Sequence, residues 1–209
     1  SKQIDMESQA RVNTQLIDYL ERSGSENLDR DTRRYLAQAL QQLGMAQLEQ
    51  GTESIAVIDQ GIADEAFNSF TRSRALYRSL LEEEPASQNA RFDMGIADFY
   101  VGYTHLRTGA LASAEQPFKD YAMQMEALYR ENPSDINFIF EFAASKQALF
   151  NLRLKRESTF TLELEADMTA AIDAAETAVA AVPGEAAMLD ALSVVMNMAS
   201  SALARECLY

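Results

Sequence analysis

The side chains that could do chemistry in this chain are few and stand apart. The single histidine, His105, has no carboxylate three or four residues away, so we expect a structural or surface role for it. The single cysteine, Cys207, can form neither an intrachain disulfide nor a cysteine zinc site. Glu163 and Asp167 have i, i+4 spacing, but two carboxylates without an imidazole make a weak metal site. No P-loop, GxSxG or GxGxxG pattern occurs. The sequence therefore predicts no catalysis, no cofactor and no metal ion.

Composition predicts which elements position these residues. The 209 residues include only 8 Gly and 4 Pro, while Ala, Leu, Gln, Glu and Arg are abundant. Those abundant residues favour helices, and the β-branched and aromatic runs of a sheet protein are missing. We therefore predict an all-α fold made of a few long helices.

The charge distribution limits the classes of partner. The formal net charge is -14, of which residues 157–209 carry -8 and residues 1–109 carry -6. Nucleic acids and anionic membranes repel such a chain. The acidic residues form either a solvated face or a docking surface for a basic partner. Because no apolar run approaches a membrane span and the start is polar, we expect no membrane insertion. We expect a cytoplasmic fragment of a longer protein.

Proline and glycine divide the chain into repeats. Pro85, Pro133 and Pro183 each follow a long amphipathic stretch, at spacings of 48 and 50. Proline ends helices, so each should mark a corner between two helices. About eight helices are expected, near 4–22, 30–50, 62–84, 87–108, 112–131, 135–155, 160–182 and 185–206. The regular spacing of the prolines predicts one domain, 1–209, with repeats at roughly 30–85, 86–133 and 134–183.

A second signal lies between these corners. Gly44, Leu48 and Gly51 share the spacing Gly–x3–Leu–x2–Gly with Gly102, Leu106 and Gly109. From Gly102 to Phe118 the residues resemble a tetratricopeptide repeat, with Ala114 at the small site of the second helix. The resemblance implies a right-handed superhelical stack of about four antiparallel hairpins, and Gly109 as a left-handed turn residue. The repeats are longer than that family's 34 residues. The chain therefore resembles the long-helix relatives found in bacterial regulatory and signalling proteins.

The resemblance also implies a binding surface. In such stacks the first helix of each pair lines a concave groove, where partners bind. The positions carried over are Gln42, Met45, Phe99, Tyr103, Arg107, Lys146 and Arg153, with Tyr100 and Leu106 among their neighbours. Lysine and asparagine, which clamp a carboxylate in some family members, are replaced by Gln41, Met45, Phe99 and Tyr103, so no clamp is expected. Aromatic residues at helical spacing are also common in cores.

Two functions remain open at this point. The first is a non-enzymatic scaffold that binds a peptide or a helix in the groove. The alternative is a structural module, which dimerises through the apolar C-terminal helix or spaces neighbouring domains. Glu82, Glu83 and Glu84 lie at the unfavourable end of a predicted helix. They either form a solvated corner or face a basic neighbour or partner.

Overall fold

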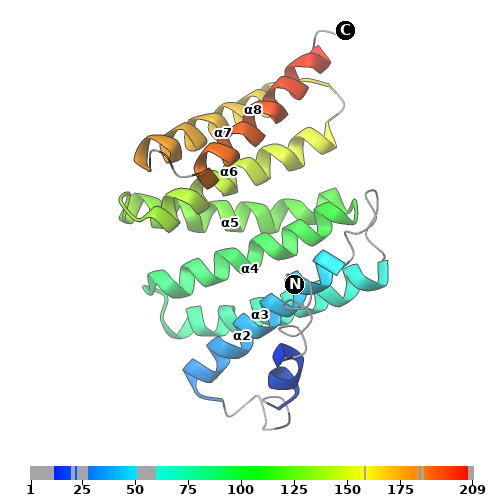
Figure 1. Ribbon diagram of the computed structural model, residues 1–209, viewed down its shortest axis with the longest axis vertical. Helices are drawn as coiled ribbons and strands as arrows, with labels where there is room; N and C mark the ends of the chain where they lie inside the picture. The colour runs from blue at the N-terminus through cyan, green and yellow to red at the C-terminus, as the bar shows by residue number, and fades with distance from the viewer. Residues whose placement is uncertain are drawn as a thin grey trace. The chain divides into compact units, whose positions relative to one another are not determined.

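The structure is a computed structural model that describes residues 12–19, 22, 28–50, 60–157, 159–182, 184 and 186–206. It is all-α over these residues, as predicted, and they contain no strand. Residues 12–19 are helical. The helices that follow are α2 (Arg30–Gln50), α3 (Gln60–Glu83), α4 (Gln88–Arg107), α5 (Leu111–Glu131), α6 (Ile136–Arg156), α7 (Leu162–Ala181) and α8 (Ala186–Glu206) (Figure 1).

Most of the helix bounds predicted from the sequence are confirmed to within two residues. Pro85 and Pro133 lie in short turns, α3–α4 and α5–α6, with a capping side chain after each. The Ser87 side chain accepts a hydrogen bond from the Ala90 N–H, and Asp135 accepts from Asn137 and Phe138. These caps satisfy N–H groups that have no partner within the helix. Pro183, Gly51 and much of the predicted helix 4–22 lie outside the described residues.

Gly109 ends α4 in the left-handed turn that the sequence predicts. Its φ is +78°, which costs glycine little and other residues more. The Gly109 N–H donates to the Leu106 carbonyl, and the Ala110 N–H donates to the His105 carbonyl at 2.9 Å. These two bonds form a Schellman motif, which satisfies carbonyls at the end of the helix.

Contacts along the chain divide it into two compact units, residues 1–110 and 111–209. The division falls directly after the turn at Gly109. The prediction of a single domain with one continuous superhelix therefore stays a prediction.

In the first unit, α3 packs against both α2 and α4. Near one end, one apolar cluster joins all three helices through Ala37, Tyr77, Leu80, Met94 and Ala97. Toward the other end of the helices, Phe70 of α3 is fully buried, and its ring stacks on Tyr100 of α4 at a centroid distance of 4.8 Å. In this unit α2 thus contacts both the next helix, α3, and the one after it, α4.

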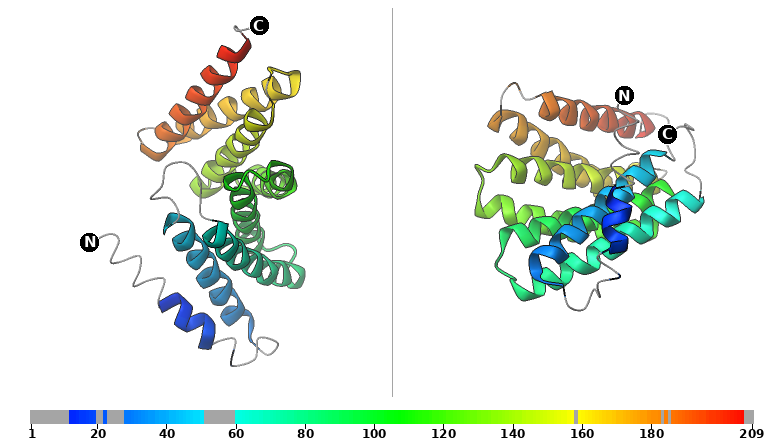
Figure 2. Two further views of the ribbon diagram at one scale, coloured as in Figure 1. Left: turned by 90° about the vertical axis from the view of Figure 1, so that its right-hand side faces the viewer. Right: turned by 60° about the horizontal axis from the view of Figure 1, so that its bottom comes forward.

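In the second unit, successive helices α5 to α8 also pack side by side (Figures 1 and 2). A core cluster joins α6, α7 and α8 through side chains that include Phe150, Leu164 and Val195. Ala171 and Ala175 of α7 belong to the same cluster, and their small side chains let the neighbouring helices approach closely.

Candidate functional site

Three of the predicted groove residues lie together on α4. The rings of Phe99 and Tyr103 stack at a centroid distance of 5.7 Å and an interplanar angle of 18°. The Arg107 guanidinium lies 5.6 Å from the Tyr103 ring centroid, and Nη1 donates to the Tyr103 hydroxyl at 2.8 Å. All three side chains are partly exposed. We call Phe99, Tyr103 and Arg107 the α4 ladder.

Two further predicted residues are on α2 and face solvent. Met45 is 36% exposed, and Gln42 is exposed while accepting a hydrogen bond from Asn13 Nδ2 at 3.1 Å. Asn13 is buried, so Gln42 also helps to hold the helical segment 12–19 against α2.

Of two neighbours predicted to line the groove, one is buried and the other is partly exposed. Leu106 is 8% exposed, and Tyr100 stacks on buried Phe70. Tyr103 is intermediate, because its ring also packs against the core cluster that contains Phe70 and Val101. The helical spacing of these aromatic residues predicts that they share one side of a helix. It does not predict which of them neighbouring helices cover.

The remaining predicted residues, Lys146 and Arg153, belong to the second unit and are both paired. Lys146 Nζ lies 2.7 Å from a Glu126 carboxylate oxygen, and the ammonium lies over the Phe142 ring. Arg153 pairs with Asp167 and with Glu157, the latter at 3.1 Å. Each cation ties α6 to a neighbour, α5 or α7, which is sufficient structural reason for its position.

The acidic run at the end of α3 has a basic neighbour inside the chain. Arg30 forms a two-pronged pair with Glu84, and Arg33 Nη2 lies 2.7 Å from Glu83 Oε1. Both arginines come from the first turn of α2. The partner required by the glutamates is therefore provided by the preceding helix. Glu82 is exposed.

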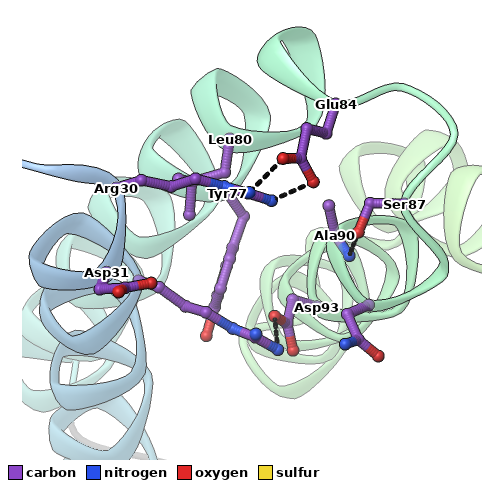
Figure 3. Close-up of a pocket in the computed structure, with 10 residues that line it drawn as sticks. Arg30, Asp31, Tyr77, Leu80, Glu84, Ser87, Ala90 and Asp93 are labelled. Carbon is purple, nitrogen blue, oxygen red and sulfur yellow. Dashed lines mark hydrogen bonds and ion pairs between the residues drawn. The ribbon is translucent and has the colours of Figure 1, made fainter.

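Beside these pairs, a cleft of about 300 Å³ opens between the start of α2, the end of α3 and the start of α4 (Figure 3). The ionisable groups that line the cleft are Arg30, Asp31, Arg34, Tyr77, Glu84 and Asp93. None of them was singled out from the sequence as a site residue. The available signal was the cluster of three arginines at 30–34 opposite the acidic run, but nothing local relates residues 50 to 60 positions apart.

The inner part of the cleft holds a second ion pair. Arg34 Nη2 lies 2.8 Å from Asp93 Oδ2, and the Asp93 side chain is 16% exposed. Burial raises the pKa of the Asp93 carboxyl, and the nearby Arg34 opposes this without cancelling it. The pKa of the Tyr77 phenol is also raised, because its ring is buried and Asp93 lies close by.

The described residues offer no catalytic or metal-binding constellation. They contain no group of three His, Cys, Asp or Glu side chains placed to hold a metal ion. His105 lies against Phe67, at a centroid distance of 4.8 Å, and burial lowers its pKa. Asp167 is occupied by Arg153, and Cys207 lies outside the described residues. Within the same part of the chain, no helix is long and apolar enough to cross a membrane.

Comparison with known proteins includes a distant structural likeness. No protein-family model matches the chain, and no curated protein matches it. A solved structure described as "MamA AMB-1 P212121" is similar, with a TM-score of 0.41 and 16% sequence identity. The match covers 84% of this chain and 85% of that one.

Proposed function

We propose that this chain is a non-enzymatic protein-interaction module that binds a peptide or a helix on the surface formed by α2 and α4. The observation that carries the proposal is the α4 ladder. Its stacked aromatic pair is partly exposed on a rigid helix, and its cation is held in place over one ring. Aromatic and arginine side chains that are already ordered lose little conformational entropy on binding, and such residues dominate protein interfaces.

The state of Arg107 adds to this support. Carboxylates outnumber cations 32 to 18 in the chain. Among the described residues, nevertheless, Arg107 has no carboxylate within 4 Å, and the Tyr103 hydroxyl is its hydrogen-bond partner. Its place in the last turn of α4 suits the helix dipole. The dipole alone does not require the Arg107 guanidinium to lie over the Tyr103 ring. In that position the guanidinium is an ordered hydrogen-bond donor at the edge of an apolar face.

A randomised peptide display library, selected on the wild-type protein, tests the proposal. We expect enriched peptides whose affinity falls at least about ten-fold with Phe99→Ala or Met45→Ala, because each change removes partly exposed apolar surface. Met123→Ala is the matched control, since Met123 is also a methionine, lies on α5 outside the proposed surface and is 61% exposed. Circular dichroism and thermal melting show whether each variant is folded.

Equal binding by all the variants, or equal losses with Met123→Ala and Met45→Ala, would reject this surface. If Phe99→Ala unfolds the protein, then Met45→Ala and Arg107→Gln still decide the question. Their side chains are partly exposed.

A second function, self-association through α8, is favoured by a separate observation. Val194, Met196 and Leu203 of α8 are 45%, 48% and 44% exposed. Met196 and Leu203 are seven residues apart and so share one flank of the helix. A second copy of this helix would cover that flank.

Analytical ultracentrifugation distinguishes this second function. If α8 mediates dimerisation, the wild-type protein sediments as a dimer, and Met196→Glu with Leu203→Glu converts it to a monomer. Met123→Glu is the control, because Met123 is 61% exposed on α5. A wild-type protein that stays monomeric at high concentration would contradict self-association through α8.

A further inference from the structure

The cleft between α2, α3 and α4 contains the hydroxyl of a largely buried tyrosine that no other described residue uses. Tyr77 lines the cleft and is only 2% exposed. Among the described residues, none forms a hydrogen bond with its hydroxyl. Figure 3 shows the side chain leaving α3 and extending into the cleft. The hydroxyl oxygen itself reaches the open space of the cleft, where a ligand or water can form a hydrogen bond with it.

The charges around this hydroxyl leave an excess of one carboxylate. Arg30 is paired with Glu84, and Arg34 with Asp93, so both guanidinium groups are already neutralised. The fifth charged side chain of the lining is Asp31, in the first turn of α2. It has no cation within 4 Å among the described residues. The cleft therefore has a formal charge of -1, in a chain whose net charge is -14.

This arrangement of charges favours a cationic ligand over an anionic one. An anion would meet guanidinium groups whose charges Glu84 and Asp93 already balance, and it would face the whole acidic chain. Arg34 Nε has no acceptor, but this donor is buried beneath other atoms and so is not exposed to an anion in the cleft. A cation has acceptors available in the Tyr77 oxygen and the Asp31 carboxylate. It would also add positive charge beside Asp93, a buried carboxylate that a single arginine compensates.

We propose that this cleft binds a primary ammonium or guanidinium group on an aliphatic stem, with the cation donating to the Tyr77 hydroxyl oxygen and to the Asp31 carboxylate. The stem would lie against Leu80 and Ala90, the apolar part of the lining. The cation can come from a lysine or arginine side chain of a partner protein or from a free small amine. The cleft is separate from the α4 ladder, so this inference does not depend on the proposed function.

A titration with defined small probes tests the assignment. We expect n-butylamine and n-butylguanidine to shift backbone amide signals of Arg34, Tyr77 and Asp93 in ¹H–¹⁵N NMR spectra. Sodium butyrate and tetramethylammonium chloride, at the same ionic strength, should leave them in place. Butyrate has the same stem with the opposite charge, and tetramethylammonium has the charge without a donor. Butyrate binding as tightly as butylamine, or no saturable shift with either cation, would overturn the proposal.

Variants locate the contacts. We expect Tyr77→Phe and Asp31→Asn each to weaken butylamine binding about ten-fold, as loss of a hydrogen bond to a charged group does. Glu82→Gln is the matched control, because it removes one exposed carboxylate from the same end of α3 without touching the lining. It should change the affinity less than two-fold. If Glu82→Gln weakens binding as much as Asp31→Asn, the cation is held by the general acidity of the surface, and the site is refuted.

The source of the cation is decided by a second pair of probes. One is a capped pentapeptide of four glycines with a central lysine, and the other is 1,4-diaminobutane. Saturable binding of the peptide identifies a protein side chain, whereas binding of the diamine alone identifies a small free amine. Binding of neither, while both are soluble at tens of millimolar, contradicts the proposal. Because Tyr77→Phe removes an unpartnered hydroxyl, the variant should fold, and its melting temperature verifies this.

Discussion

A β-carbon added to Gly44 of α2 would stand 2.7 Å from Cε1 of Phe70 on α3. Phe70 is fully buried, and its other face is occupied by Tyr100. Gly44 is therefore a point of close approach between α2 and α3. The Phe70 ring at this point cannot move away, because Tyr100 packs against it. The glycine that the sequence repeat places in the first helix has this steric reason.

Replacement of Gly44 by alanine should destabilise the protein. Alanine gains about 1 kcal/mol of helix propensity, but forcing a methyl group into a packed core costs about 1–3 kcal/mol. We expect a net loss of about 1 kcal/mol in the free energy of unfolding, measured by urea denaturation. Gly61→Ala, at an exposed position in the first turn of α3, should instead be neutral or stabilising. Equal effects of the two substitutions would contradict the steric account.

Asp98 of α4 is 1% exposed and pairs with Arg74 of α3. Arg74→Met leaves a buried carboxylate without its cation, which should lower the unfolding free energy by about 3–5 kcal/mol. The double variant Arg74→Met, Asp98→Leu should recover most of this loss, because the buried charge is then gone. Chemical denaturation of the single and double variants measures the coupling. Arg78→Met, one turn further along α3 and exposed, should change stability by less than about 0.5 kcal/mol.

Glu141 of α6 gives the stability of the second unit a pH dependence. Its carboxyl accepts a hydrogen bond from the Tyr121 hydroxyl. Burial nevertheless raises its pKa, and the Tyr121 bond opposes the shift only in part. Because the folded pKa exceeds the unfolded one, this contribution is present below the unfolded value near 4.5 and is lost as pH rises through the folded value.

Glu141→Gln should therefore be relatively more stable at pH 7 than at pH 4, when each is compared with wild type by urea denaturation. Glu126→Gln provides the opposite case. Lys146 lowers the pKa of Glu126, so this substitution should cost about 0.5 kcal/mol at pH 7 and less at pH 4. The same sign for the two variants would refute the assignment.

His105 adds a pH dependence of its own in the first unit. Burial against Phe67 lowers its pKa below 6.5, so the folded state favours the neutral imidazole. The stabilising contribution is present above the unfolded pKa and is lost as pH falls through the folded value. His105→Phe should keep the ring contact and flatten the stability profile between about pH 5 and pH 7. Thermal melting across that range measures the difference, and an unchanged slope would mean that the imidazole is exposed in the folded state.

The helices could be predicted from sequence because their ends are determined locally. Pro85, Ser87 and Gly109 each act within a few residues of themselves, through a missing donor, a cap or a left-handed turn. The interaction surface could be predicted only in part. Phe99, Tyr103 and Arg107 do lie on one face of α4, but helical spacing did not reveal that Leu106 is buried and that Tyr100 stacks on Phe70.

Long-range pairing accounts for what the sequence did not provide. Arg30 meets Glu84 and Arg34 meets Asp93 across more than 50 residues of chain, and neither pair has a local signature. The unpartnered hydroxyl of Tyr77 is likewise visible only when three helices are assembled around it. From the sequence, Tyr77 is one more apolar position on an amphipathic helix.

The ion pairs between α2 and α3 have a consequence for how this hairpin finds its alignment. Arg30 and Arg33 stand at the positive end of one helix, and Glu83 and Glu84 stand at the negative end of the other. Each set disfavours its own helix in isolation and is relieved only by the partner. A slip of one turn would break both bridges and leave four charges facing the wrong dipoles. Shifted alignments of the hairpin are therefore disfavoured. The two helices are expected to become stable together rather than one after the other.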